Sequence, residues 1–408
     1  MKKITFMLFS MLAMLTVFCS CSNDDDDKET MTNYASIVVD GNSIINEDDD
    51  QAVTISVMLA YAPKNDVTVN FSLQNNDGEV ASIQNEATAT IPAGQKTLSV
   101  AIKSNNKHQL SVPRVITVNA NFSDPNIKTD GKTCSLTINP DSDIPELTAD
   151  QLKLIEGYKE KYNLDLTKIL GKVNVSTLVT FNDDDKVDYN DNNDTRSFSG
   201  TTIITLSDKA TADKPVLKMV ANAMGMAAFN YEMLRKKTVE DNEYFTQTPF
   251  GAAVMNAISY DYNKETFTMT LDGIEVNPTD MTLQFTGKKT TIYDDEITTI
   301  PFDYTFSAWT RLKAMADEGK SLVVDDGETK TEYSVQDIID GGGTINPSAF
   351  FDNTDIEEDA TETSYPNIYV KPVGKIDFAG GKMTFAFPWY LDNTYGCQRV
   401  EATYNFGK

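Results

Sequence analysis

The chain has 408 residues, 40% hydrophobic and 24% charged, enough for two or three domains with sizeable cores. Its formal net charge of −26 argues against nucleic acid and anionic membrane surfaces as partners, because both would repel it. A single histidine, His108, excludes a two-histidine metalloprotease motif and leaves the C-terminal part without a Ser-His-Asp or Cys-His pair.

Residues 1–20 are predicted to be a signal peptide. Lys2 and Lys3 are followed by residues 4–18, which carry no charge. A basic head, an apolar body and a small residue at the cut are typical of a secretory leader. Because the apolar run is shorter than the roughly 20 residues of a membrane-spanning helix, we expect it to be removed.

The leader ends at two cysteines, Cys19 and Cys21. This segment resembles the signal of bacterial lipoproteins, in which a cysteine receives a diacylglyceryl group and becomes the first residue after cleavage. We favour Cys21, because small Ser20 precedes it whereas bulky Phe18 precedes Cys19. Phe18 stands where leucine is commoner, so the choice between the two cysteines stays open. Two or three acyl chains would anchor the protein firmly.

Residues 21–31 form an acidic tether. Its charges follow the cysteine directly, at Asp24, Asp25, Asp26 and Asp27. This block resembles the export signal that sends lipoproteins of Bacteroidetes to the outer face of the outer membrane. A run of like charges is also typical of a solvated spacer, and that alternative stays open. The resemblance implies a lipid-anchored protein of the cell outer membrane that faces outward.

Residues 32–142 are predicted to form strands throughout. Apolar and polar side chains alternate in six runs, at residues 52–59, 66–73, 88–91, 97–102, 114–119 and 134–138. Such alternation indicates strands with one buried and one solvated face, and Pro, Gly and Asn-Asp turn signals separate the runs. About seven short strands over this length predict an immunoglobulin-like β-sandwich.

The same region resembles a Calx-β domain. The resemblance rests on the acidic residues 47–50 before a strand and on Ile-Pro-Ala-Gly-Gln at 91–95. It implies a Ca²⁺ site of clustered acidic side chains at one end of the sandwich. The candidate ligands are Glu47, Asp48, Asp49, Asp141 and Asp143. Ser-Asn-Asn-Lys-His at 104–108 stands where an acidic loop is expected, so a solvated acidic loop is the alternative.

A linker at residues 140–145 separates this domain from the rest of the chain. Thr148 and Gln151 then form a capping box for a helix that extends to residue 162, with one apolar stripe. We interpret this helix as one that packs on a sheet.

Residues 145–408 are predicted to form a strand-rich domain with mostly antiparallel pairing. Strands are expected at residues 172–181, 200–206 and 399–406, and hairpins within 260–271, 281–293 and 375–387. Ser307 and Ser334 are expected to cap short helices. Residues 216–236 fit no single pattern, and their methionines are interpreted as core. The fold class is therefore mainly β with α+β, an immunoglobulin-like β-sandwich followed by a strand-rich antiparallel α+β domain.

Two further patterns favour structural roles. Cys134 and Cys397 are expected to be buried apolar residues, with a disulfide as the alternative, and two distant thiols argue against structural zinc. Residues 188–192 carry oxygen side chains at alternate positions, as in a calcium loop. Ser199 stands where the bidentate glutamate belongs, so a solvated hairpin loop is expected there.

An aromatic cluster near the C-terminus offers a candidate ligand-binding site. Trp389, Tyr390 and Tyr395 lie close together, with Asp392 and Asn393 between them. Rings in a loop can stack on sugar faces while the two polar side chains bind hydroxyl groups. Rings also fill cores, and that alternative stays open.

The layout as a whole resembles surface lipoproteins of Bacteroides of unknown function, many of which sit beside glycan-uptake systems. This resemblance implies non-catalytic binding of an extracellular glycan or protein, with the sandwich as a spacer. One alternative is a glycoside hydrolase, which needs two carboxyl groups roughly 5 to 10 Å apart. Another is a structural adhesin or assembly subunit. No cofactor is expected besides the candidate Ca²⁺, and the partner expected for the lipid anchor is the outer membrane.

Overall fold

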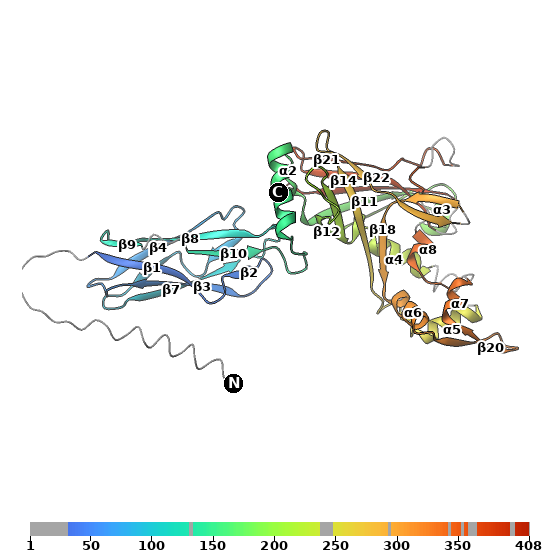
Figure 1. The fold of residues 1–408 in the computed structure, drawn as a ribbon, viewed down its shortest axis with the longest axis horizontal. Coiled ribbons are helices and arrows are strands. Elements are labelled where there is room, and N and C mark those ends of the chain that lie inside the picture. Colours follow the sequence, from blue (N-terminus) through green and yellow to red (C-terminus); the bar gives the residue numbers. More distant parts are fainter. Residues whose placement is uncertain are drawn as a thin grey trace, which may run out of the picture.

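The computed structural model describes residues 32–129, 134–236, 248–292, 295–341, 344–351, 355–357, 365–391 and 396–407. These residues form two β-rich domains, and each domain has its own cluster of buried apolar side chains. Figure 1 shows the two domains end to end, with the first in blue and cyan. The mainly β, α+β class predicted from the sequence is confirmed.

The first domain is a sandwich of two five-stranded sheets, with strand orders β5-β7-β3-β1-β9 and β2-β10-β8-β4-β6. Its strands are β1 (Asn33–Asp40), β2 (Ile44–Asn46), β3 (Ala52–Leu59), β4 (Val67–Gln74), β5 (Ala81–Ile83), β6 (Thr88–Ile91), β7 (Thr97–Ser104), β8 (Arg114–Phe122), β9 (Ile127–Thr129) and β10 (Cys134–Asn139). Pairing is antiparallel except between β1 and β9 and between β2 and β10.

Side-chain alternation explains why most of these strands form. In β3, Val53, Ile55 and Val57 face the core, while the residues between them are partly exposed. The six predicted runs correspond to β3, β4, β6, β7, β8 and β10 and are confirmed. Strand β1 was not predicted because its Ile-Val-Val run does not alternate. Strands β2, β5 and β9 have three residues each, too few to show a period.

Helix α2 (Ala149–Tyr162) opens the second domain as predicted. The Thr148 hydroxyl accepts a hydrogen bond from the Gln151 amide at 3.2 Å, and the Gln151 side chain accepts one from the Thr148 amide at 2.9 Å. Ile155 and Tyr158 are buried on one face. Because the reciprocal bonds satisfy two amides at the helix start, this capping box fixes where α2 begins.

The second domain is organised around one nine-stranded sheet of order β13-β12-β11-β23-β22-β21-β15-β14-β18. Strand β13 also pairs with β14, so the sheet closes on itself. Its strands are β11 (Gly171–Thr180), β12 (Thr195–Leu206), β13 (Val216–Ala221), β14 (Phe267–Val276), β15 (Thr282–Phe285), β18 (Phe302–Phe306), β21 (Val373–Asp377), β22 (Lys382–Trp389) and β23 (Gln398–Asn405).

Two small hairpins and several short helices surround this sheet. The hairpins pair β16 (Lys288–Ile292) with β17 (Asp295–Thr299), and β19 (Ser321–Asp325) with β20 (Lys330–Ser334). The helices are η1 (Leu166–Lys168), α3 (Asp185–Tyr189), η2 (Ala223–Gly225), α4 (Ala227–Arg235), α5 (Pro249–Ala257), α6 (Ser307–Asp317), α7 (Val335–Asp340) and α8 (Pro347–Phe351).

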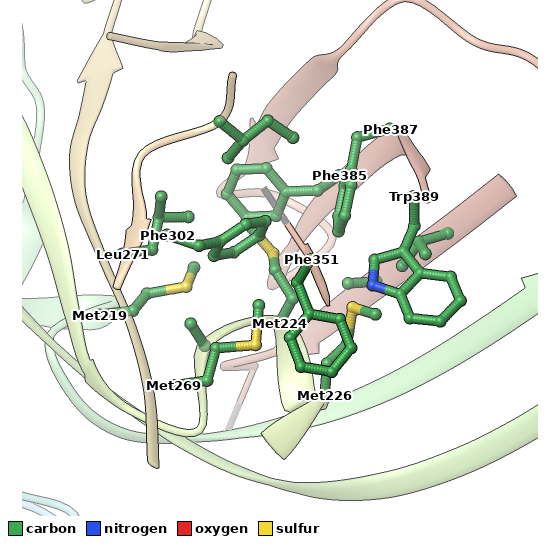
Figure 2. Close-up of a cluster of buried hydrophobic side chains, with 14 of the residues drawn as sticks. Met219, Met224, Met226, Met269, Leu271, Phe302, Phe351, Phe385, Phe387 and Trp389 are labelled. Atoms are coloured by element: carbon green, nitrogen blue, oxygen red, sulfur yellow. The ribbon is translucent and has the colours of Figure 1, made fainter. Parts of the chain in front are cut away.

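Methionines and aromatic rings fill the core of the second domain. Figure 2 shows the thioethers of Met219, Met224, Met226 and Met269 beside the rings of Phe302, Phe351, Phe385, Phe387 and Trp389. The prediction that the methionines of residues 216–236 are core is confirmed, because every one of them is fully buried. Flexible thioethers suit this position because they adapt to gaps between rigid rings.

Two of the three predicted hairpins are wrong. Residues 260–262 do not form a strand, and β14 pairs with β13, β15 and β18. Likewise β15 pairs with β14 and β21, whereas β16 pairs with β17. Turn residues and alternation indicate that strands exist, but contacts between distant segments choose their partners. The third hairpin, β21 with β22, is confirmed.

Candidate functional site

Trp389 lies in the core of the second domain, so its predicted role in stacking on a sugar is wrong. It ends β22 and is only 4% exposed. Its ring centroid lies 5.1 Å from that of Phe229. The centroid of Phe351 lies 6.2 Å away, and Figure 2 shows this ring beside Trp389. Pairing with Gln398 of β23 holds Trp389 within the sheet, and the rings of the closed core cover it.

The rest of the aromatic cluster is only partly described. Tyr390 is half-buried directly after β22. Asp392, Asn393 and Tyr395 lie outside the described residues. Ligand binding by these four residues stays a prediction.

Three of the predicted calcium ligands are engaged within the first domain. The Glu47 carboxylate is fully buried and accepts hydrogen bonds from the amides of Gln109 and Leu110, at 2.7 to 2.9 Å. Asp48 accepts bonds from the amide and hydroxyl of Ser142, and the hydroxyl bond lowers the pKa of that carboxyl. Asp49 accepts a bond from the amide of Asn46 at 2.7 Å.

The other two predicted ligands, Asp141 and Asp143, bind a lysine of the second domain. Lys172 in β11 places its ammonium nitrogen 2.9 Å from Asp141 Oδ2 and 3.0 Å from Asp143 Oδ1. Asp141 is 1% exposed, and its Oδ2 also lies 2.8 Å from His108 Nδ1. Burial disfavours the charged form of Lys172, but its bonds to the two carboxylates outweigh this effect and raise its pKa.

The five acidic residues therefore surround the domain junction. Within the described part of the chain, no group of three or more His, Cys, Asp or Glu side chains is arranged to hold a metal ion. Calcium binding by Glu47, Asp48, Asp49, Asp141 and Asp143 stays a prediction. Carboxylates that already accept protein hydrogen bonds would have to exchange these bonds for the cation.

Cys134 and Cys397 are both buried, as expected, and neither forms a disulfide with a described residue. Residues 185–189 form helix α3 within the candidate calcium loop of the second domain. The lipidation and export residues, Cys21 and Asp24 to Asp27, lie outside the described residues. None of the helices in the described part of the chain has the length and hydropathy of a membrane span.

A cleft with a volume of about 740 Å³ lies between the two domains, next to the Asp141–Lys172 pair. The first domain contributes the Asp77-Gly78 turn, residues 107–110 and Arg114. The second contributes η1, the start of β11, the β21–β22 turn and residues 405–407. The cleft is therefore assembled from segments that are distant in the chain.

Direct contacts between the domains hold the two walls of the cleft together. The Ser111 hydroxyl donates a hydrogen bond to the Thr167 carbonyl oxygen at 2.6 Å. Gly171 has a φ of +90° and packs so closely that a Cβ there would lie 3.2 Å from the Ser111 Cβ and 3.3 Å from the Leu110 oxygen. Any larger residue at this position would be strained at this φ and would require the Leu110-Ser111 segment of the first domain to shift.

Positive charge dominates the lining of the cleft, in contrast to the chain as a whole. Four lining residues, Lys107, Arg114, Lys168 and Lys172, are basic, whereas Asp77 is the one acidic residue among the described lining. The whole chain has 61 acidic and 35 basic Lys or Arg residues. A cleft lined mainly by one sign of charge concentrates the field and attracts ions of the opposite sign.

One feature of the sequence, a basic pair in the loop at residues 107–108, indicates this cleft. Lys107 and His108 stand where the Calx-β resemblance implies an acidic loop, and this exchange was interpreted only as weakening a calcium site. In the structure the same loop forms a wall of the cleft. His108 was predicted to be a surface residue, and its side chain is indeed 51% exposed, although it contacts Asp141.

The chain is therefore a two-domain, β-rich protein with a cleft of about 740 Å³ between its domains. A family model described as "Domain of unknown function (DUF8472)" matches residues 145–405, and the chain belongs to this family. The match covers the second domain. None of the curated proteins matches the chain.

Several solved structures, including the following three, have some similarity to the chain. The CBD12 structure from CALX1.2 has 12% identity and a TM-score of 0.22, covering 50% of this chain and 89% of that one. A two-domain protein with unknown function from Bacteroides fragilis has 10% identity and a TM-score of 0.21, covering 47% and 66%. A protein of unknown function from Bacteroides ovatus has 7% identity and a TM-score of 0.19, covering 91% and 94%.

Proposed function

We propose that the protein is a lipid-anchored, non-catalytic protein of the outer-membrane surface that binds an extracellular ligand, such as a glycan or a protein, between its two domains. The observation that carries this proposal is the cleft, because both domains line it and its volume of about 740 Å³ lies within the range of ligand pockets. The anchor part of the proposal rests on the leader, Cys21 and the aspartate block.

The arrangement of the first domain suits a spacer between the anchor and the cleft. The amide of Asn33, where the domain begins, donates to the carbonyl of Asn126 just beyond the C-terminal end of β8. Arg114, at the opposite end of β8, lines the cleft. A strand of nine residues spans about 30 Å, so the start of the first domain and the cleft lie at opposite ends of the sandwich.

Binding is better supported than glycoside hydrolysis. Hydrolysis requires two carboxyl groups on either side of the bond that is cut. Asp77 is the one carboxylate among the described residues of the cleft. Three carboxylates, Asp261, Glu265 and Glu318, line a second cavity. Each of them is paired with a cation, Lys264, Arg311 and Lys320 respectively.

The anchor is tested by metabolic palmitate labelling of cells that express the wild type, Cys21→Ala or Cys19→Ala. We expect label in the wild type and in Cys19→Ala, and loss of label in Cys21→Ala. Protease treatment of intact cells should cleave the full-length labelled wild-type protein and leave the label on a short membrane-bound peptide. Equal label in the wild type and Cys21→Ala would overturn the assignment of Cys21.

Ligand binding is tested with the chain from residue 22 onward, which keeps both domains, on an array of neutral and charged glycans and in pulldown from surface extracts. We expect binding that Gly171→Leu abolishes, because this substitution requires the Leu110-Ser111 segment at the wall of the cleft to shift. The same array with Gly94→Leu is a matched control, because Gly94 also has a positive φ, of +80°, but an added Cβ meets nothing within 4 Å. Equal binding by both variants would contradict a ligand site between the domains.

A further inference from the structure

The charged groups of the cleft differ in whether they already have a partner. Lys172 is bound by Asp141 and Asp143, so its charge is balanced within the protein. Arg114 donates to the backbone carbonyl of Asp77. Lys107 and Lys168 make no ion pair with any described carboxylate. Three cationic side chains that face the cleft, Lys107, Arg114 and Lys168, are thus available to an anion.

These cations come from both domains. Lys107 lies in the loop before β8 and Arg114 begins β8, whereas Lys168 ends η1. The Ser111–Thr167 hydrogen bond holds the loop and η1 together. Because packing already fixes the two backbones, little conformational entropy would be lost from the walls of the cleft when an anion binds between them.

The remaining lining offers an aromatic surface and amides. Phe378 and Phe406 form an edge-to-face pair with centroids 5.8 Å apart, and both rings are half-buried. Asn174 of β11 and Asn405 of β23 are exposed register partners on adjacent strands. Half-buried rings can cover the C–H face of a sugar, and amide groups can both donate to and accept from hydroxyl groups.

From these three observations we infer that the cleft binds an anionic glycan, one whose sugar residues carry carboxylate or sulfate groups. This inference rests on the proposed function and adds the chemical class of the ligand. Lys107, Arg114 and Lys168 would bind the acidic groups through charge-assisted hydrogen bonds. Nucleic acid is disfavoured, because its dense charge would meet a chain with a net charge of −26 beyond the cleft.

The test is isothermal titration calorimetry of the chain from residue 22 onward with four tetrasaccharides. These are an oligogalacturonate, its methyl ester, a sulfated carrageenan fragment and the desulfated form of that fragment. Each pair shares a backbone and differs in charge, so the carboxylate and sulfate sources are distinguished. We expect at least one charged probe to bind about tenfold more tightly than its neutral partner, and added salt to weaken its binding.

Variants then locate the site. Lys107→Ala/Lys168→Ala should weaken binding of the charged probe about tenfold. Lys153→Ala/Lys313→Ala removes the same net charge from exposed helix surfaces outside the cleft and should change binding less than twofold. Circular dichroism of both variants checks that folding is unchanged.

Two outcomes would overturn the inference. If charged and neutral partners bind equally and Gly171→Leu abolishes both, the cleft binds glycans without charge selection, and the proposed function survives. If no charged probe binds, or if the control variant weakens binding as much as the cleft variant, anion selection in the cleft is wrong. The array of neutral and charged ligands then decides separately whether the proposed function stands.

Discussion

Asp141 links the two domains through its contact with Lys172. It is nearly fully buried, and a single oxygen, Oδ2, contacts both Lys172 and His108. A buried carboxylate is costly unless charged or hydrogen-bonding groups compensate it. Asp141 therefore stabilises the protein only while Lys172, from the other domain, stays in place. The Calx-β resemblance implied a metal ligand here, and the sequence does not distinguish an aspartate that binds a cation from one that pairs with a lysine.

We predict that Asp141→Asn lowers the free energy of unfolding by about 1–3 kcal/mol, because the charge-assisted bond to Lys172 is lost. Asp143→Asn should cost less than about 1 kcal/mol, because Asp143 bonds the same lysine but is 54% exposed. Urea denaturation of the two variants and the wild type measures the difference. Equal effects would show that burial of Asp141 is not what gives the pair its strength.

At the scale of elements, Glu265 ties helix α6 to strand β14. Its side chain is 3% exposed and accepts bonds from Arg311 and from the Ser307 hydroxyl, and the same hydroxyl accepts a bond from the Thr266 amide. The prediction that Ser307 caps α6 is therefore wrong: α6 has no side-chain cap, and Phe306 precedes its first residue. Ser334 does cap α7, as predicted, by accepting from the Asp337 amide at 3.0 Å.

The tie between Glu265 and α6 should depend on pH. Burial tends to raise the pKa of Glu265, but the bonds from Arg311 and Ser307 outweigh burial and lower it. Because the pKa is lower in the folded state than the unfolded value of about 4.3, the stabilisation is present above that value and is lost as the pH falls through the folded pKa.

We therefore expect Glu265→Gln to destabilise the protein at neutral pH and to differ less from the wild type as the pH falls below about 4. Urea denaturation at a series of pH values measures this difference. Glu318→Gln is the control, because Glu318 is 60% exposed and pairs only with Lys320 among the described residues. A stability difference for Glu265→Gln that does not change with pH would contradict the assignment of the ionised carboxylate.

At the scale of the whole molecule, the two domains have separate cores. The cluster in the sandwich and the cluster in the closed sheet share no residue. The domains meet through a few polar contacts, such as the Ser111–Thr167 bond and the Asp141–Lys172 pair. Each core should therefore unfold largely as its own cooperative unit.

Calorimetry should resolve two unfolding transitions, and matched core substitutions should assign them. Ile55 in the first domain and Ile204 in the second are both fully buried. Replacing either by alanine should cost about 2–5 kcal/mol and lower one transition only. A single transition lowered equally by both substitutions would show instead that the domains unfold together.

Local features allowed much of the fold to be predicted. Alternation in residues 52–59 or 114–119 and the capping box at Thr148 arise between neighbours in the chain, so they are visible in the sequence. The candidate site was predicted less well. In the sequence, Trp389 comes after a run of alternating residues, and an aromatic residue in an exposed loop could stand at the same place. Only its packing against Phe229 and Phe351 shows that Trp389 lies in the core.

The sequence by itself determined the β-rich class, most strand positions and three of the seven α-helices in the described residues, α2, α6 and α7, because hydrophobic period, turn residues and helix caps act over a few residues. Only the tertiary structure decided which strands pair, that β13 and β14 close the sheet, and that a basic cleft forms in an acidic chain. The physical reason is that these features depend on contacts between distant residues, such as Asp141 with Lys172 and Ser111 with Thr167, which form only when both domains are folded.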